Sequence, residues 1–125
     1  MSTALLTALL SFRSMKIDLP QLNREYATLR QHLAQVGWIS QGYVQDRGPG
    51  AGGPCYQWTR KVKGKTVSVA LSKEQFEALQ EAIENWRQTQ EILNRMQALS
   101  RSMIFGTLPD TRRRKRLTKK VLGLN

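Results

Sequence analysis

The chain has 125 residues, and its 20 Lys and Arg against 9 Asp and Glu give a formal net charge of +11. This length is enough for one domain, with a smaller core than that of a typical enzyme. The charge excess favours a polyanionic partner, such as DNA, RNA or an acidic membrane surface.

The cysteine and histidine content restricts the chemistry that the chain can perform. Cys55 is the only cysteine, which excludes an internal disulfide and a cysteine-based zinc site. His32 is the only histidine, so there is no second imidazole for a metal site, and histidine-dependent catalysis is disfavoured. Composition does not exclude carboxylate chemistry. We expect a protein that is not an enzyme and that uses no metal and no cofactor.

The first residues, MSTALLTALLSF, are apolar but differ from a signal peptide. They lack a positively charged start, their apolar run is short and interrupted by Thr and Ser, and no clear cleavage site follows. No segment reaches the roughly 18 apolar residues of a membrane helix. We expect a cytoplasmic protein with no membrane contact, in which residues 1–19 are an extension and Met15 is an alternative start to Met1.

Residues 20–36 predict the first helix. Apolar side chains recur there at helical spacing and form one stripe. Asp18 and Pro20 suit the beginning of the helix, and Gly37 stands where a C-cap glycine is expected. The stripe consists of Leu22, Tyr26, Leu29, Leu33 and Val36.

A strand and a glycine-rich connection are predicted next. The β-branched and aromatic residues of WISQGYVQ (38–45) favour a strand. DRGPGAGGP (46–54) holds four glycines and two prolines, which argues against regular structure. It lacks the Gly-Lys-Ser/Thr ending of a phosphate-binding loop, so we interpret it as a flexible connection between strands.

Residues 55–71 predict a β-hairpin with a two-residue turn at Lys63-Gly64. This turn pairs Val62 with Lys65, Arg60 with Val67, Trp58 with Val69 and Tyr56 with Leu71. The period of two then gives two unlike faces. The apolar face carries Tyr56, Trp58, Val62, Val67, Val69 and Leu71, with Arg60 at its edge. The polar face carries Gln57, Thr59, Lys61, Thr66 and Ser68, with Lys63 at the tip.

A long helix is predicted from Ser72 to about residue 104, before Gly106 and Pro109. Ser72 and Gln75 form a capping box at its start. At 1.5 Å per residue the helix is roughly 45–50 Å long, which exceeds what one small core needs. The first half is expected to cover the sheet. The second half needs either the helix at 20–36, folded back, or the same helix of a second subunit.

The packing of sheet and long helix is expected to bury seven apolar side chains: Trp58, Val67, Val69, Phe76, Leu79, Ile83 and Trp86.

Four glutamates follow one face of the long helix: Glu74, Glu77, Glu81 and Glu84. Carboxylates at this spacing can bind a metal ion, as in nucleases that use magnesium. Acidic residues in the first turns also favour the positive end of the helix dipole. We interpret these residues as a solvated face and expect no metal there.

The tail TRRRKRLTKKVLGLN contains seven basic residues and no acid. Such a block is usually disordered alone and often binds nucleic acid as an arm. The hairpin offers a second contact surface, because small sheets enter the DNA major groove. Stacking of single-stranded bases on Tyr56 and Trp58 is the competing idea, which their apolar face disfavours. The expected contact residues are Gln57, Thr59, Arg60, Lys61, Lys63, Lys65 and Thr66 in the hairpin and Arg112, Arg113, Arg114, Lys115, Arg116, Lys119 and Lys120 in the tail.

Residues 53–87, GPCYQWTRKVKGKTVSVALSKEQFEALQEAIENWR, resemble a family of small bacterial proteins of unassigned function that are associated with transposons and other mobile elements. The likeness extends over about residues 20–105. Many relatives carry a cysteine cluster where this chain has DRGPGAGG, so no metal is carried over. The hairpin and helix also resemble the arm-binding domains of tyrosine recombinases at the level of the fold. The matching positions are Gly53, Pro54, Tyr56, Gly64, Lys65, Thr66, Lys73 and Glu74.

Together these observations predict an α+β fold with an N-terminal helix, a small three-stranded antiparallel sheet, a long C-terminal helix and a basic tail. Residues 20–105 are expected to form a single domain, followed by the tail at 106–125. The expected function is that of a nucleic-acid-binding accessory protein of a mobile genetic element, with double-stranded DNA preferred. The alternatives are an RNA-binding subunit of a ribonucleoprotein and a helical adaptor that recruits a recombinase or nuclease. A homodimer through the long helix and association with a larger mobile-element protein both remain open.

Overall fold

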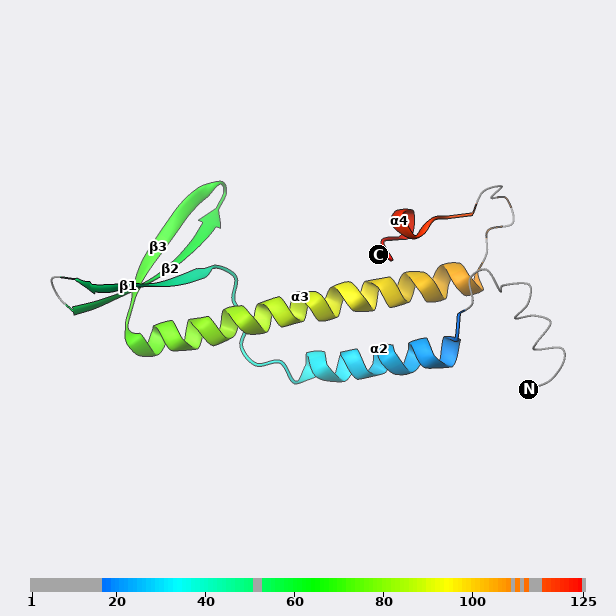
Figure 1. Cartoon of the computed structure of the whole chain (residues 1–125), viewed down its shortest axis with the longest axis horizontal. Coiled ribbons are helices and arrows are strands. Elements are labelled where there is room, and N and C mark those ends of the chain that lie inside the picture. Colours follow the sequence, from blue (N-terminus) through cyan, green and yellow to red (C-terminus); the bar gives the residue numbers. More distant parts are fainter. Residues whose placement is uncertain (1–16, 51–52, 109, 111, 113–115, 125) are drawn as a thin grey trace. The chain divides into compact units, whose positions relative to one another are not determined.

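The computed structural model describes residues 17–50, 53–108, 110, 112 and 116–124 (Figure 1). It has the α+β fold that the sequence predicts, with a helix, a three-stranded antiparallel sheet and a long helix. The elements are α2 (Leu19–Ala34), β1 (Tyr43–Gly50), β2 (Gly53–Val62), β3 (Lys65–Leu71), α3 (Lys73–Thr107) and α4 (Lys119–Leu122).

Two compact units divide the chain, and α3 contributes to both. The first contains α2, α4 and the part of α3 from Ile92 onward. The second runs from Gln35 to Glu91 and contains the sheet and the first half of α3. The domain limits expected from the sequence stay a prediction.

α2 begins where the sequence indicates. The Gln21 N–H donates to Asp18 Oδ1 at 3.1 Å, so Asp18 caps the helix as predicted. The predicted C-cap was wrong, because α2 ends at Ala34, three residues before Gly37. Gly37 does not adopt a left-handed backbone, and a Cβ there would lie 3.2 Å from Asn85 Nδ2. The absence of a side chain at Gly37 therefore lets Asn85 of α3 lie close to it within the second unit.

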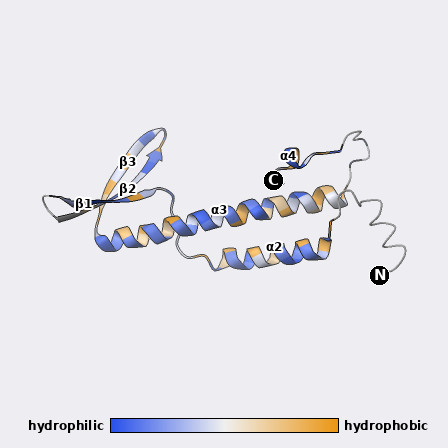
Figure 2. Cartoon of the chain, in the orientation of Figure 1, coloured by the Kyte–Doolittle hydropathy of each residue, from blue (hydrophilic) through white to orange (hydrophobic). Residues whose placement is uncertain are grey.

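The second half of α3 packs against α2, which is the folded-back arrangement considered above. Arg95 donates to both carboxylate oxygens of Glu25, with Nη2 at 3.0 Å from Oε1. Ile17, just before α2, lies against Gly106 near the end of α3, so the two helices run antiparallel. Apolar residues recur along both helices, with polar residues between them (Figure 2), and Leu99 is only 2% exposed.

α3 starts at the predicted capping box and ends slightly later than predicted. The Ser72 N–H donates to Gln75 Oε1 at 2.9 Å, and the Gln75 N–H donates to Ser72 Oγ at 3.1 Å. The helix continues through Gly106 to Thr107. Gly106 is buried, and a Cβ there would lie 2.6 Å from Ile17 Cδ1. Gly106 therefore permits close contact between α3 and Ile17, and it does not end the helix.

The β2–β3 register agrees with the prediction, from Tyr56↔Leu71 to Val62↔Lys65. Lys63 has φ 51° and Gly64 has φ 80°. Positive φ at both turn residues is the signature of a type I′ turn, whose twist matches that of the paired strands. Period-two alternation then places the polar and apolar side chains on opposite faces, as expected.

β1 differs from the prediction, because it begins at Tyr43 and extends through the glycine-rich segment to Gly50. The assignment of residues 46–54 as irregular was therefore wrong for the residues described there. A register shift between Asp46 and Pro49 accommodates Gly48, which has φ 78° and donates its N–H to Asp46 Oδ1 at 2.9 Å. Pro49 pairs with Pro54. Proline has no backbone N–H to donate, which costs little here, because Pro49 lies on an edge strand and Pro54 lies outside the β2–β3 pairing.

The first half of α3 packs against only part of the sheet. The rings of Tyr56 and Phe76 are 4.7 Å apart, and Ile83 is 6% exposed. The predicted burial of Val67 and Val69 was wrong, since they are 37% and 42% exposed. The turn end of the β2–β3 hairpin projects away from α3 (Figure 1), so the helix does not cover these two residues. Of the other side chains expected to be buried, four are half-buried: Trp58, Phe76, Leu79 and Trp86.

Replacing Gly106 with Val should destabilise the protein, because Ile17 already occupies the space that the new side chain needs. We expect the free energy of unfolding to fall by about 1–3 kcal/mol, measured by urea denaturation. Adding Ile17→Ala should recover part of this loss. Equal stability of the single and double variants would show that the contact with Ile17 is not the cause.

The stability of the protein should depend on pH through Glu25. The hydrogen bonds and charge of Arg95 lower the pKa of Glu25, so the stabilisation is present above the ordinary pKa and is lost as pH falls through the lowered pKa. At neutral pH, Glu25→Gln should cost about 0.5 kcal/mol, because solvent screens a pair whose side chains are 53% and 33% exposed. The difference in free energy of unfolding between the wild-type protein and Glu25→Gln should vanish in acid. A difference that stays constant at all pH values would show that the charge of Glu25 is not its cause.

Candidate nucleic-acid interface

The strand registers assemble one polar face on the sheet. The pairs Gln45↔Gln57 and Thr59↔Ser68 place their side chains on the same side, and so does Lys61↔Thr66. The hydroxyls of Thr59 and Ser68 are 3.2 Å apart and share a hydrogen bond. These groups form a continuous row of hydrogen-bond donors and acceptors on the face opposite Tyr56 and Trp58. We call this surface the polar face; it comprises Tyr43, Gln45, Arg47, Gln57, Thr59, Lys61, Thr66 and Ser68.

The hairpin residues predicted to bind nucleic acid do not all lie on this face. Gln57, Thr59, Lys61 and Thr66 lie on it, and Lys63 lies at the turn. Arg60 and Lys65 pair with Val67 and Val62, so they lie on the opposite face. The predicted set is therefore split between the two faces of the hairpin.

Arg60 has a role that the sequence did not reveal. Its guanidinium carbon lies 5.2 Å from the centre of the Trp58 ring, which is a cation–π distance. The indole N–H of Trp58 in turn donates to the backbone oxygen of Gln41 at 3.0 Å. Trp58 thus contacts Arg60 through the face of its ring and Gln41 through its indole N–H. This half-buried position is consistent with the expectation that Trp58 is not a free platform for base stacking.

Arg47 joins the polar face through the part of β1 that sequence analysis missed, and Tyr43 joins it from the part that was predicted as a strand. Arg47 Nη1 donates to Gln57 Oε1 at 3.2 Å, which brings a cation from the glycine-rich segment onto the face. Tyr43 pairs with Thr59 and is 59% exposed. Composition had marked residues 46–54 as a loop, so only the strand pairing could have placed Arg47.

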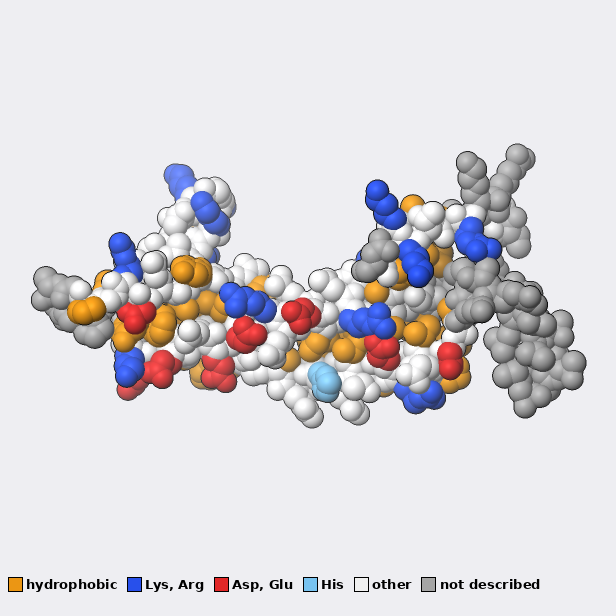
Figure 3. Space-filling view, viewed as in Figure 1, with side chains coloured by type: hydrophobic (Ala, Val, Ile, Leu, Met, Phe, Trp, Pro, Cys, Tyr) orange, Lys and Arg blue, Asp and Glu red, His pale blue; other side chains and the backbone are white. Residues whose placement is uncertain are grey.

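Charge is distributed unequally within the second unit. The sequence from residue 53 to residue 71 contains four basic and no acidic residues. The first half of α3 instead carries five glutamates, including Glu74, Glu77, Glu81 and Glu84. Lys and Arg side chains lie at the outer end of the hairpin in Figure 3, whereas acidic side chains follow α3. The polar face itself has no acidic residue in the part of the chain that the structure describes.

The basic tail is more ordered than expected at its end. Thr118 caps α4 by accepting from the Val121 N–H at 3.2 Å, and Gly123 closes the helix with φ 70°. Leu122 is only 6% exposed, so it is part of the core. The expectation of a tail without structure of its own was therefore wrong for residues 118–124, because that expectation considered only the charges.

The basic residues of the tail are only partly described. Arg112, Arg116, Lys119 and Lys120 are exposed, and Arg112 Nε lies 3.2 Å from Asp110 Oδ1. Arg113, Arg114 and Lys115 lie outside the described residues. The hairpin belongs to the second unit and the tail to the first.

The rest of the described chain offers few alternative sites. No group of three or more His, Cys, Asp or Glu side chains is placed to hold a metal ion among residues 17–50, 53–108, 110, 112 and 116–124. Across the same residues, no helix is long and apolar enough to cross a membrane. Comparison of the chain with protein-family models, curated proteins and solved structures gave no significant match.

Leu122 should hold the end of the tail in place. Replacing it with Ala removes buried apolar surface from a short segment and should shift that segment toward the undocked state. We expect trypsin to cleave after Lys119 and Lys120 about tenfold faster, since a loss of ~1.4 kcal/mol changes the ratio of docked to undocked chains tenfold. Val121→Ala is the matched control, because Val121 is 70% exposed and should have no effect. Equal cleavage of both variants would contradict the anchoring role.

Proposed function

We propose that the protein is a non-enzymatic, nucleic-acid-binding accessory factor of a mobile genetic element, which acts in the cytoplasm and binds double-stranded DNA through the polar face. The supporting observation is an exposed β-sheet surface that combines amide, hydroxyl and cationic groups and holds no acid among its described residues. Such groups suit both base edges and phosphates.

The geometry of the hairpin supports double-stranded DNA as the target. Two- and three-stranded sheets enter the major groove, and they need a face that nothing else in the protein covers. The outer end of β2–β3 projects away from α3 (Figure 1). Lys61 and Thr66 are exposed there, and Thr59 is half-buried. Gln57 and Thr59 would contact base edges, while Lys61 and Lys63 would contact phosphates.

The tail would add affinity without adding sequence preference. Cations that contact phosphates release condensed counterions, so each contact makes binding more dependent on salt. The exposed Arg112, Arg116, Lys119 and Lys120 are suited to this role, and the sequence adds Arg113, Arg114 and Lys115. The mobile-element context rests on the resemblance at residues 53–87.

Lys61 and Lys65 provide a test of which face binds. They have the same charge and lie near the same turn, but the register places them on opposite faces. We expect Lys61→Gln to weaken binding of a fluorescein-labelled 20-base-pair duplex about three- to fivefold and to reduce the slope of log K against log salt by ~0.9. Lys65→Gln should have a much smaller effect, and equal effects of both substitutions would contradict the assignment of the polar face.

The same titration can separate this proposal from its alternatives. Five to seven neutralised phosphates predict a slope of roughly −4.5 to −6 for duplex DNA. The tail should be tested by Gln substitution of its basic residues, since deletion would also remove the buried Leu122. Tighter binding of structured RNA than of duplex DNA, at one salt concentration, would favour the alternative of an RNA-binding subunit. A slope near zero would exclude both DNA binding and RNA binding.

A further inference from the structure

β1 is an edge strand with one open side. The sheet has the order β1-β2-β3, and among the described strands β1 pairs with β2 alone. Every second residue of such a strand directs its N–H and C=O groups away from the sheet. The regular part of this edge runs from Tyr43 to Asp46, before the register shift and Pro49 interrupt it. An extended peptide can add to a strand of this kind.

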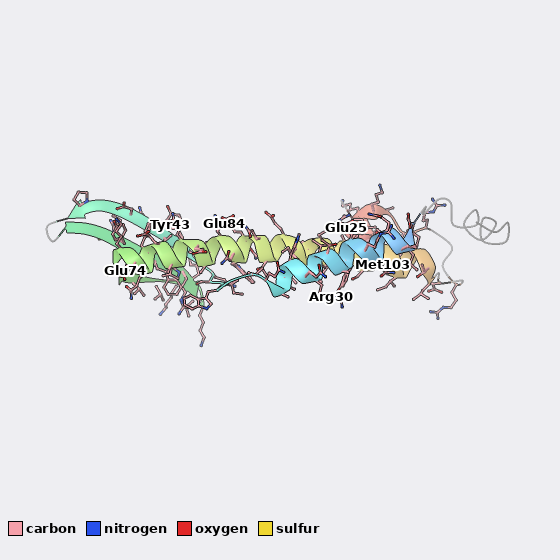
Figure 4. The ribbon with its side chains drawn as sticks, turned by 90° about the horizontal axis from the view of Figure 1, so that it is seen from below. Glu25, Arg30, Tyr43, Glu74, Glu84 and Met103 are labelled. Atoms are coloured by element: carbon pink, nitrogen blue, oxygen red, sulfur yellow. The ribbon has the colours of Figure 1, made fainter. Side chains whose placement is uncertain are left out.

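A groove lies between this strand and α3. It has a volume of about 720 Å³, and Tyr43 and Val44 line it from β1. Figures 1 and 4 both show β1 alongside the first half of α3, with Tyr43 beside Glu84 in Figure 4. The open edge and the groove therefore form one surface within the second unit. Its α3 residues are Glu77, Gln80, Glu81, Ile83, Glu84, Asn85 and Arg87.

The charge of the groove indicates what it can hold. Glu84 pairs with Arg87 at 3.2 Å, but no described residue forms an ion pair or side-chain hydrogen bond with Glu77 or Glu81. Two carboxylates beside an open strand edge repel nucleic acid and attract Lys or Arg. The polar face has the opposite preference, so the second unit presents two surfaces with different partners.

We propose that this groove binds an extended, basic segment of a partner protein, which adds to β1 as a fourth strand and directs Lys or Arg side chains toward Glu77 and Glu81. Side chains on one face of an added strand are about 6.8 Å apart, two residues at ~3.4 Å each. Glu77 and Glu81 are four helical residues apart, which is ~6 Å along the axis of α3. A Lys-x-Arg or Arg-x-Lys pattern therefore matches the two carboxylates.

The proposal goes beyond nucleic-acid binding and stands independently of it. Tyr43 borders both surfaces, but nucleic-acid binding is assigned to Thr59 and Lys61, whereas the groove uses the open edge of β1 and the acidic part of α3. A variant that loses one activity should keep the other. This separation lets the same preparations test both proposals.

The test uses the full chain and a synthetic probe, fluorescein-labelled Lys-Val-Arg-Val-Lys-Val with both ends blocked. Binding is measured by fluorescence anisotropy at low salt. The double variant Glu77→Gln, Glu81→Gln should weaken binding roughly five- to thirtyfold, the sum of two exposed ion pairs. The matched control Glu74→Gln, Glu91→Gln removes two charges from the same helix outside the groove and should change binding less than twofold.

Two further measurements distinguish strand addition from simple charge attraction. A probe with N-methyl groups on alternate residues keeps its charges but cannot form the backbone bonds, so we expect its binding to be lost. Hydrogen exchange at residues 43–46 should slow when the unmodified probe binds. Circular dichroism confirms that each variant is folded, and Glu81→Lys serves as a second variant that should bind even less.

Three outcomes would overturn the proposal. The first is absence of probe binding, and the second is equal weakening by the groove and control variants. The third is a dimer, detected by light scattering, that forms through β1 and excludes the probe, which would assign the edge to a second copy of the chain. Loss of DNA binding with the probe still bound would affect only the function proposed for the polar face.

Discussion

The length of α3 is the constraint on which the rest of the structure depends. Thirty-five helical residues carry an apolar stripe that is longer than one small element can cover. Its first half is covered on one side by Tyr56 and its neighbours in the sheet, and its second half by α2 and α4. Each half therefore has its own small core, with Ile83 buried in one and Leu99 and Leu122 in the other.

This division explains why so much of the sheet remains exposed. The first half of α3 covers only the end of the hairpin near Tyr56, so the turn end has no helix against it and Val67 and Val69 remain partly in solvent. A surface that contributes little to the core is free to be polar and basic. The acidic residues are concentrated instead on α3, beside β1. The second unit thus separates opposite charges onto different surfaces.

Sequence analysis succeeded where structure depends on near neighbours in the chain. Ser72 and Gln75 cap α3 through contacts three residues apart, and Lys63-Gly64 determines the whole β2–β3 register through its turn. It failed where composition suggested one structure and a distant partner imposed another. Residues 46–50 are rich in glycine and still form a strand, because β2 supplies the backbone partners and Gly48 absorbs the bulge. The candidate site could be predicted only in part for the same reason. The pairing of Lys65 with Val62 follows from the turn, whereas the position of Arg47 on the polar face depends on the pairing of β1 with β2.

The sequence by itself determined the α+β class, the beginnings of both main helices, the hairpin register and the excess of positive charge. These features come from interactions within a few residues or from composition, so tertiary contacts are not needed to establish them. Only the tertiary structure decided that Gly106 admits Ile17, that Leu122 anchors the end of a basic tail, and that three glutamates of α3 line a groove beside β1. Burial, close approach and the shape of a groove depend on which segments face each other in space, and that choice is made by the packing of the whole chain.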